Sequence, residues 1–486
     1  MTYDVLIVGG GITGCMTAYR LSGYRLRVAV AEATGDVAMG ATKANSAIVH
    51  AGYDAVPGTL KAKYNVAGCA EMPELARLLD VPYNNCGSLV CAFSEDDMPA
   101  LRELLERGEK NGVPGLEIVS GERARELEPA LSEEIYAALW APTAGIVCPY
   151  ELCIAAGETA ARNGCDFYFN FPVERIRAAD GHLVAESRGR EISARFVVNA
   201  AGAHSAELAV KSGDLDFPVE IIPRRGEYGL LDKGKGSRVR RVVFACPTER
   251  GKGILVSPTV DGNVIVGPNA HRVESADDTS TTSEGIEEVF EGGRRLVPGV
   301  SPRDMITSFA GVRATPSTGD FYVRPSERVS GLLHLVGIES PGLAASPALS
   351  RAAVELLGEM GLHLEENPDA VMERPPVVRF RLLRASEKNE LIKRDPSYGR
   401  IVCRCETITE GEILDAIRRP LGARDIDMVK RRVRAGMGRC QGGFCSPRVA
   451  ELLAKELGIS LGEVTKKGCG SELVPRDCER DGELIV

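Results

Sequence analysis

Four cysteines near the carboxyl terminus have the spacing of ligands for an inorganic centre. Cys403 and Cys405 are followed, after thirty-four residues, by Cys440 and Cys445. Four thiolates hold structural zinc ions as well as iron–sulfur clusters. Zinc sites favour roughly two to four residues between the cysteines of each pair, and one residue separates Cys403 from Cys405. The spacing therefore favours an iron–sulfur cluster and a redox protein, and zinc is the alternative.

The amino terminus carries a second motif that could serve redox chemistry. Asp4 to Val8 is an aliphatic run that predicts a strand, and Ile12 to Leu21 predicts a helix. Between them, Gly9, Gly11 and Gly14 have the G-x-G-x-x-G spacing, which permits a tight turn, close approach of a pyrophosphate and close helix–strand packing. This order predicts a dinucleotide-binding fold with phosphates at the helix N-terminus.

The next strand supports this interpretation. Arg27 to Ala31 predicts a second strand, and Glu32 follows at its end, about twenty residues after the glycines. A carboxylate at this place accepts hydrogen bonds from a ribose and disfavours a 2′-phosphate.

Composition sets the class of protein. The chain has 486 residues, a formal net charge of −9, 44% hydrophobic and 26% charged residues, and fourteen cysteines. This length predicts two to four domains, and the charge argues against nucleic acid as a partner. An apolar run of about 18 residues, which a membrane span needs, is missing, as is a secretory leader. We expect a cytoplasmic protein with reduced or metal-bound cysteines, and membrane contact only through a partner.

Local patterns predict further elements of the middle of the chain. Asp97 to Lys110 has helical periodicity and stops at Asn111-Gly112. Val219 to Leu231 and Gly253 to Asn269 are strand-like, and the latter turns at Asp261-Gly262, a typical hairpin signal.

The carboxy-terminal part has its own pattern. Ser386 to Tyr398 is polar and charged and contains a proline, so we expect a linker over 376–398. Thr407 to Arg418 predicts a helix with Thr409 and Glu412 at capping-box spacing, and Ser446 to Leu457 predicts another. Residues 399–458 carry twelve Lys or Arg and eight Asp or Glu, a balance of +4. Such a balance would stabilise four thiolates and also suits an acidic partner.

Three segments resemble the flavin-contacting regions of the D-amino-acid oxidase superfamily, and they occur in that superfamily's order. They are Gly40 to Gly52, Arg195 to Ser205 and Leu333 to Leu343. The resemblance implies FAD rather than NAD. The residues that it and the glycine motif imply around the cofactor are Gly9, Gly11, Ile12, Thr13, Gly14, Glu32, Ala41, Thr42, Asn45, Ser46, Ala201, Gly202, Gly311, Gly337, Gly342 and Leu343.

The same resemblance implies the fold class. We expect an α/β protein with a Rossmann-type FAD-binding domain, an interleaved substrate domain built on an antiparallel sheet, and a small α-rich [2Fe–2S] domain. The expected ranges are, for the FAD-binding domain, 1–85, 143–215 and 331–375; for the substrate domain, 86–142 and 216–330; then the linker 376–398, the cluster domain 399–458 and a tail over 459–486.

Four residues are candidates for catalysis and substrate binding. Oxidation of an alcohol by flavin needs a base, for which His50 in the first flavin segment is our candidate; a loop histidine bonded to backbone and a covalent flavin link are the alternatives. Arg313 matches the superfamily's arginine for a substrate phosphate or carboxylate, to which its planar fork is suited. Arg225 and Lys43 resemble other pocket positions, with structural roles as the alternative.

The other histidines are less well placed. His204 and His271 stay open as alternatives, whereas His182 and His363 fit surface positions.

The carboxy-terminal stretch resembles the bacterioferritin-associated-ferredoxin-like [2Fe–2S] domain, which implies Cys403, Cys405, Cys440 and Cys445 as ligands. With the flavin segments, this layout resembles the anaerobic-type glycerol-3-phosphate dehydrogenase and L-2-hydroxyglutarate dehydrogenase branch. The resemblance implies a small anionic substrate, glycerol 3-phosphate first, and a separate electron-accepting flavoprotein or iron–sulfur subunit. A 2-hydroxy acid, an amine or amino acid, and a regulatory role in sensing iron or redox state are the alternatives.

Overall fold

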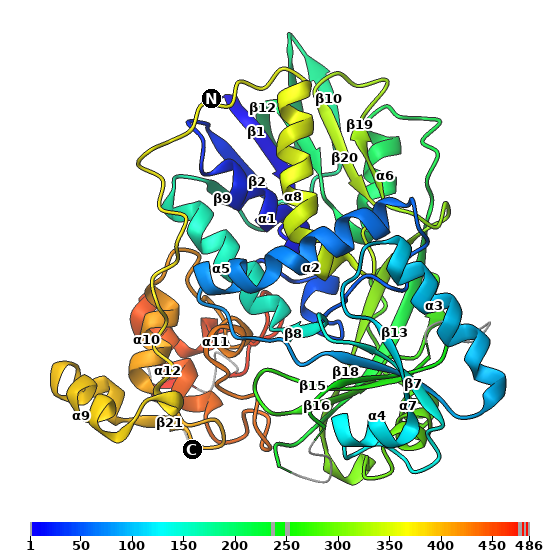
Figure 1. The fold of residues 1–486 in the computed structure, drawn as a ribbon. Helices are drawn as coiled ribbons and strands as arrows, with labels where there is room; N and C mark the ends of the chain where they lie inside the picture. The colour runs from blue at the N-terminus through cyan, green and yellow to red at the C-terminus, as the bar shows by residue number, and fades with distance from the viewer. Residues whose placement is uncertain (1, 235–238, 248–252, 475–478, 481–482, 485–486) are drawn as a thin grey trace. The chain divides into compact units, whose positions relative to one another are not determined.

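The structure is a computed structural model that describes residues 2–234, 239–247, 253–474, 479–480 and 483–484. The chain divides into two compact units, Met1–Arg374 and Pro375–Val486. The first unit is mixed α/β and the second mainly helical, as expected (Figure 1). Among the described residues, no helix is both long and apolar enough to cross a membrane.

A mostly parallel sheet forms the part of the first unit that contains the amino-terminal glycine motif. Its strands are, in spatial order, β10 (Arg175–Ala179), β11 (His182–Ser187), β12 (Arg190–Asn199), β1 (Thr2–Val8), β2 (Val28–Ala31) and β9 (Asp166–Tyr168), with β20 (Leu332–Val336) beside β12 and β19 (Tyr322–Pro325) beside β20. The helices of this part are α1 (Ile12–Leu21), α2 (Leu60–Leu78), α5 (Pro149–Arg162), α6 (Ser205–Lys211) and α8 (Gly342–Glu359). We expected β19 in the substrate domain, but it joins this sheet.

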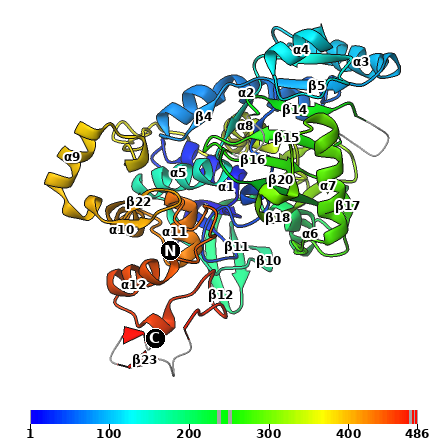
Figure 2. The same ribbon diagram turned by 90° about the horizontal axis from the view of Figure 1, so that it is seen from below.

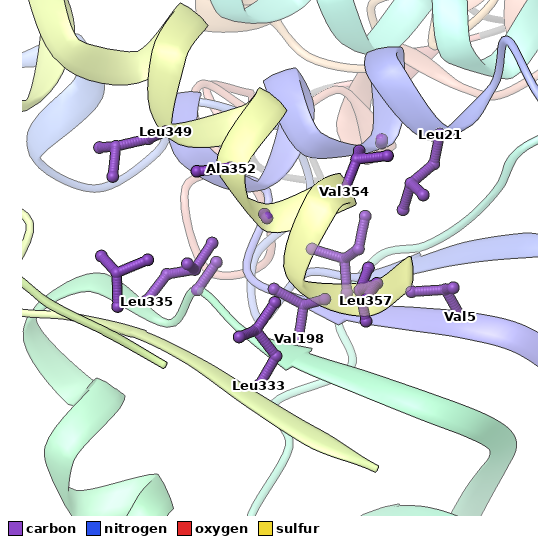
Figure 3. Packing of buried hydrophobic residues seen from close by; sticks show 14 of the residues in the cluster. Val5, Leu21, Val198, Leu333, Leu335, Leu349, Ala352, Val354 and Leu357 are labelled. Carbon is purple, nitrogen blue, oxygen red and sulfur yellow. The ribbon is translucent and has the colours of Figure 1, made fainter. Parts of the chain in front are cut away.

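The core of this part lies between the central strands and α8. Val5, Val198 and Leu333 lie on neighbouring parallel strands and are 0% exposed. Leu349 and Leu357 of α8 belong to the same buried cluster, and Figure 3 shows Leu357 beside Val5 and Val198. Burial of each such side chain contributes about 1.5–3 kcal/mol, so the three strands and α8 are held together by apolar contact.

A second, largely antiparallel sheet forms the other part of the first unit. Its strands are, in spatial order, β17 (His271–Arg272), β13 (Ile221–Leu231), β16 (Val264–Gly267), β15 (Leu255–Pro258), β14 (Val242–Ala245), β5 (Ser88–Ala92), β7 (Ala137–Ala141) and β6 (Glu117–Ser120), with β18 (Met305–Pro316) beside β13. Helix α7 (Ser283–Leu296) lies against β13, β15 and β16, and Figure 2 shows it near β15 and β16. The other helices here are α3 (Met98–Lys110) and α4 (Gly121–Leu127).

Short elements complete the first unit. A small sheet joins β3 (Ile48–Val49), β8 (Gly145–Val147) and β4 (Tyr83–Asn84), and the 3₁₀ turns are η1 (Ala41–Lys43), η2 (Glu95–Asp97), η3 (Gly202–His204) and η4 (Pro302–Asp304). The predicted hairpin at Asp261-Gly262 is confirmed, because β15 and β16 pair antiparallel across it. How the unit divides into an FAD-binding and a substrate domain stays a prediction.

The second unit is a small helical body around its own apolar core. Its elements are η5 (Phe380–Leu382), α9 (Ala385–Arg394), η6 (Pro396–Gly399), β21 (Ile401–Cys403), β22 (Ile408–Thr409), α10 (Glu410–Arg418), α11 (Ile426–Val433), α12 (Ser446–Leu457), η7 (Leu461–Glu463), β23 (Glu479–Arg480) and β24 (Glu483–Leu484). Ile413, Val429 and Leu453, one from each of α10, α11 and α12, are 0% exposed and lie in one cluster. The predicted helix over Ser446–Leu457 and the capping box of α10 are confirmed. Part of the expected tail over 459–486 lies outside the described residues.

The segment 376–398 differs from the expected linker, because it folds with the second unit. Helix α9 occupies its centre, and Leu391 of this helix is buried. The ring of Tyr398 lies over Gly411 of α10. The backbone N–H of Phe380 donates to the Glu412 carboxylate at 3.0 Å. The polar composition predicted a linker because these few anchoring contacts cannot be recognised from composition.

We predict that Glu412→Ala destabilises the second unit more than Thr409→Ala. Glu412 is 3% exposed and its carboxylate accepts from Thr409 N, Thr409 Oγ1 and Phe380 N at 2.8–3.0 Å. Loss of the cap alone costs about 1 kcal/mol, whereas buried donors left without an acceptor each cost about 1–3 kcal/mol. Calorimetric unfolding of the two variants checks this, and equal losses would show that Glu412 serves the cap alone.

Candidate functional site

The glycine loop after β1 is held by backbone contacts that only glycine permits. Gly9 has a φ of +108°, and a Cβ there would lie 2.4 Å from the carbonyl oxygen of Ala200. A Cβ on Gly14 would lie 1.9 Å from the carbonyl oxygen of Gly9. Helix α1 therefore packs directly on the turn, and the turn packs directly on the end of β12.

Gly11 differs from these two glycines. A Cβ there would meet only the Thr42 hydroxyl, at an ordinary 3.4 Å. The protein itself therefore has room for a side chain at Gly11, and the space at the start of α1 is open to a ligand. Ile12 and Thr13 stand in the first turn of this helix, and the side chains of that turn are uncharged. This N-terminus suits a pyrophosphate.

Glu32 is fixed at the same loop. Its Oε2 accepts from Gly10 N at 2.7 Å, and its Oε1 accepts from the backbone and hydroxyl of Thr34 at 2.8 and 2.7 Å. The carboxylate is 9% exposed, so it is oriented before any ligand binds. A carboxylate has about four acceptor positions, which leaves capacity for a ribose hydroxyl. The glycine loop and this acceptor therefore fit a dinucleotide such as FAD.

The segment after β2 folds as a loop across α1. The Thr42 hydroxyl accepts from Ile12 N at 3.0 Å. Asn45 donates to the carbonyls of Ala41 and Thr42 and accepts from Ala47 N, all at 2.8–3.1 Å, so its side chain shapes the loop. Ser46 is half-buried.

The second and third segments lie at neighbouring strand ends. Ala201 and Gly202 follow β12, and Ala201 lies within reach of a Cβ on Gly9, at 3.2 Å. Gly337 follows β20, while Gly342 and Leu343 begin α8. Because β1, β12 and β20 are parallel neighbours, these segments gather at the carboxyl edge of the sheet, where ligands of such folds bind.

Strand β18 brings the second sheet onto Gly40 to Gly52, the first segment that resembles a flavin-contacting region, which we call the flavin loop. A Cβ on Gly311 would lie 2.0 Å from the carbonyl oxygen of Ala44. Arg313 is two residues further on, on the same face of the strand. Its Nη2 lies 3.5 Å from the carbonyl oxygen of Asn269. Arg313 is thus half-buried beside the flavin loop, where an anion could meet it.

Arg225 is not brought together with Arg313. On β13, Arg224 pairs with Arg313 and Arg225 pairs with Val312, so the two arginines point to opposite faces of the sheet. Arg225 forms ion pairs with Glu227 at 3.1 Å and Asp278 at 2.7 Å. Its guanidinium is therefore neutralised on the face that does not carry Gly311, and a structural role fits it better than substrate binding.

Lys43 and His50 lie on the flavin loop itself. The Lys43 side chain is exposed, with its Nζ 3.8 Å from the sulfur of Met39. His50 is half-buried with its ring 5.8 Å from that of Phe244, and its carbonyl oxygen accepts from Asn65 Nδ2 at 2.5 Å. The backbone of the candidate base is therefore anchored.

The other candidate histidines lie at the surface. His204 contacts Asp277 at 3.1 Å, and His271 contacts Glu288 of α7 at 2.8 Å; their side chains are about half exposed. His271 pairs with Arg225 and so shares its face of the sheet.

Sequence reasoning missed His334, which is 0% exposed in the centre of β20. Its Nε2 lies 2.7 Å from Asp214 Oδ2, and because a carboxylate only accepts, Nε2 carries the proton. Nδ1 then accepts from Asn199 Nδ2 at 3.3 Å. Asn199 also donates to Ser205 O and accepts from Ala201 N. The signal was a single polar residue inside the apolar run 332–336.

Burial lowers the pKa of His334 from its usual 6.5, although Asp214 acts in the opposite direction. The neutral ring therefore orients Asn199, and Asn199 holds the turn at Ala201. The chain Asp214–His334–Asn199 links the interior of the first unit to the second flavin segment.

The four cysteines gather in two pairs. Cys405 Sγ lies 3.6 Å from Cys440 Sγ. A hydrogen bond with Cys445 lowers the pKa of Cys403 to about 6, so a thiolate is available near neutral pH. Backbone N–H groups of Gly436 and Glu406 also point to Cys403. Within the described residues, no three His, Cys, Asp or Glu side chains are grouped for one metal ion.

A buried ion pair supports the cysteine loops. Glu406 follows Cys405 and is 4% exposed. It accepts from Arg434 Nε at 2.8 Å and lies 3.4 Å from Arg381 Nη1. Two thiol pairs with backbone donors directed at sulfur fit a [2Fe–2S] cluster, which takes four cysteine ligands.

Comparison with known proteins agrees with this geometry. Residues 4–356 match the FAD dependent oxidoreductase family, and residues 401–455 match the BFD-like [2Fe-2S] binding domain. The chain therefore belongs to the FAD dependent oxidoreductase family and carries a [2Fe–2S] domain. The predictions of an oxidoreductase fold, of FAD and of a [2Fe–2S] cluster are confirmed.

Individual relatives are similar over long stretches. The chain is 45% identical to a glycerol 3-phosphate dehydrogenase of Caloramator mitchellensis, over 97% of this chain and 98% of the relative. It is 29% identical to the mitochondrial L-2-hydroxyglutarate dehydrogenase of Mus musculus, over 72% and 87%. A solved L-alpha-glycerophosphate oxidase from Mycoplasma pneumoniae with FAD bound has a TM-score of 0.73 at 31% identity, covering 78% of this chain and 100% of that one.

We predict that Gly11→Ala and Gly14→Ala fail in different ways. Gly11→Ala should leave the melting temperature of the FAD-free protein unchanged, because the added methyl group meets only Thr42 at 3.4 Å, and should weaken FAD binding. Gly14→Ala should lower the melting temperature itself, because backbone must move away from 1.9 Å. Thermal unfolding and FAD titration of the FAD-free proteins measure both. If Gly11→Ala left the FAD affinity unchanged, the pyrophosphate would have to bind elsewhere than at this loop.

We predict that His334 makes the first unit sensitive to acid. A lowered pKa means that the unfolded chain takes the proton first, so stability falls as the pH drops below about 6.5. His334→Gln, which can donate to Asp214 and accept from Asn199, should lack this part of the loss. His334→Leu should cost about 3 kcal/mol at pH 7.5, because it leaves two buried polar groups without a partner, and less at pH 5.5, where the wild type itself has lost part of the contribution of His334. Denaturant unfolding at pH 7.5 and 5.5 measures the loss of stability in each protein. An equal loss between these pH values in wild type and His334→Gln would contradict the prediction.

Proposed function

We propose that this protein oxidises glycerol 3-phosphate to dihydroxyacetone phosphate and delivers the electrons to a separate acceptor. The observation that carries the proposal is Arg313, a half-buried guanidinium on the strand face that packs on the flavin loop through Gly311. A fork of N–H donors there suits a phosphate dianion. The 45% identity to a glycerol 3-phosphate dehydrogenase over nearly the whole of both chains supports this substrate.

The cofactors set what the protein must supply. When bound, FAD accepts a hydride from the substrate carbon, and the [2Fe–2S] cluster transfers single electrons onward. The glycine loop and Glu32 hold the dinucleotide, and Cys403, Cys405, Cys440 and Cys445 hold the cluster.

The remaining tasks fall to side chains of the flavin loop and of β18. Arg313 binds the phosphate and so fixes which carbon faces the flavin. His50 is the candidate that takes the hydroxyl proton, so that alcohol becomes ketone as the hydride leaves. His50→Ala should therefore slow flavin reduction, and an unchanged rate would remove His50 from the mechanism.

Oxidation of a 2-hydroxy acid such as L-2-hydroxyglutarate is the second candidate. It is supported by the 29% identity to a mitochondrial L-2-hydroxyglutarate dehydrogenase, and by Arg313, because its fork binds a carboxylate as well as a phosphate. An electron-accepting flavoprotein or iron–sulfur subunit is the proposed partner in either case.

The absorption spectrum of the oxygen-free protein distinguishes the two substrates. Glycerol 3-phosphate should bleach the flavin band, and L-2-hydroxyglutarate in a separate sample should leave it intact. Bleaching by L-2-hydroxyglutarate alone would show that the hydroxy acid, and not glycerol 3-phosphate, is the substrate. Bleaching by neither compound would refute both alcohols while FAD and cluster remain visible in the same spectrum.

We predict that Arg313→Ala raises the KM for glycerol 3-phosphate by about 10- to 100-fold, because a hydrogen bond to a charged group contributes about 1.5–3 kcal/mol. The kcat should change less, since the phosphate is held in both ground and transition states. Arg225→Lys is the matched control, which should keep the KM and lower the melting temperature. Steady-state kinetics measure KM and kcat of both variants. A rise in KM in Arg225→Lys alone would assign substrate binding to Arg225 and a structural role to Arg313.

A further inference from the structure

The cysteine ligands of the second unit are unequally exposed. Cys403 and Cys445 are 1% and 3% exposed, whereas Cys405 is exposed and Cys440 is half-exposed. The sulfurs of Cys405 and Cys440 lie 3.6 Å apart, so they form one edge. The cluster site therefore has a covered side and a side that opens to the surface. Because electron transfer slows steeply with distance, the open edge is the natural place for exchange.

The open edge carries a large exposed aromatic side chain. Phe444 is 88% exposed, and in the described part of the chain it is the most exposed of the large hydrophobic residues. Its backbone N–H is directed at the sulfur of Cys440. A single exposed apolar residue is ordinary, but this ring adjoins a cluster ligand, and aromatic anchors of this kind often dominate protein interfaces.

Two arginines adjoin this edge in sequence. Arg404 and Arg439 directly precede Cys405 and Cys440, and both are exposed. The acidic residue nearest in sequence, Glu406, is buried and its charge is compensated by Arg434 at 2.8 Å. Two of the arginines that give residues 399–458 their positive net charge therefore stand beside the exposed cysteines in the sequence.

We propose that Arg404, Cys405, Arg439, Cys440 and Phe444 form the docking face for the electron acceptor, and that this acceptor is a redox protein with an acidic surface around its own cofactor. The inference rests on the proposed function. Each oxidised substrate yields two electrons, so the reduced protein loses one electron in each of two encounters, and each acceptor gains one. A small charged face suits such brief encounters, since redox complexes bury little area and opposite charges speed association.

Two other occupants could cover this face, namely the flavin-binding unit of the same chain and a second copy of the chain. A positive surface is unfavourable for contact with the same positive surface of a second copy. The experiment separates all three.

The direct test measures binding of the full-length holoenzyme to a fluorescently labelled flavodoxin, an acidic one-electron carrier, by anisotropy at low ionic strength. Arg404→Glu with Arg439→Glu should raise the Kd by about tenfold or more and reduce its dependence on salt. Phe444→Ser should raise the Kd several-fold at unchanged salt dependence. Iron content and the cluster absorption band confirm that the variants retain the cluster.

Matched controls lie on the same unit outside the cysteine loops. Arg384→Glu, at the residue before α9, together with Arg394→Glu, at its last residue, makes the same change in net charge, and Leu382→Ser removes a side chain that is 67% exposed. Both should keep the wild-type Kd. Equal weakening in the controls, unchanged binding in the face variants, or no saturable binding by the wild type would each overturn the proposal.

A second measurement separates this inference from the proposed function. Bleaching of the flavin by glycerol 3-phosphate should be the same in wild type and face variants; its absence in the wild type would refute the substrate while the binding result stands. Slower cluster reduction by substrate, with an unchanged flavodoxin Kd, would assign the face to the chain's own flavin unit. Loss of a dimer in sedimentation would assign it to a second copy.

Discussion

Direct backbone-to-backbone packing at glycines is the constraint on which the rest of the first unit depends. Helix α1 rests on the turn at Gly9 through Gly14, and Gly9 rests on the end of β12 at Ala200. Strand β18 rests on the flavin loop through Gly311. Any side chain at these places would push apart elements from both sheets. The dinucleotide site and the strand that carries Arg313 are therefore positioned by the same kind of contact.

The arginines of this protein differ in whether a carboxylate neutralises the guanidinium. Arg225 meets Glu227 and Asp278, and Arg434 meets the buried Glu406. Leaving such a buried charge without a partner would cost several kcal/mol, so these pairs belong to the fold. Arg313 instead meets a backbone carbonyl oxygen, and a neutral dipole leaves its positive charge to attract an anion.

Features encoded by short spacing were predictable from sequence. The glycine turn, the hairpin at Asp261-Gly262 and the capping box at Thr409 each depend on residues only a few positions apart, and each is present. The face of Arg225 was not predictable, because it depends on the register of β13 against β18. The fold of 376–398 was missed since its anchors, such as Glu412, lie far along the chain. His334 was missed because its partners Asp214 and Asn199 are distant in sequence.

The two cofactors demand opposite treatments of their surroundings. Hydride transfer requires a substrate held in place and water kept away, and the proposed function assigns this task to the anchored loop that β18 contacts through Gly311. Single-electron exchange with another protein requires no substrate pocket, only a short path to the surface. The second unit buries Cys403 and Cys445 in its core while Cys405 and Cys440 remain accessible, which suits the electron exchange proposed above. Burying all four cysteines would stabilise the cluster further, but it would lengthen the path that the electrons must cross.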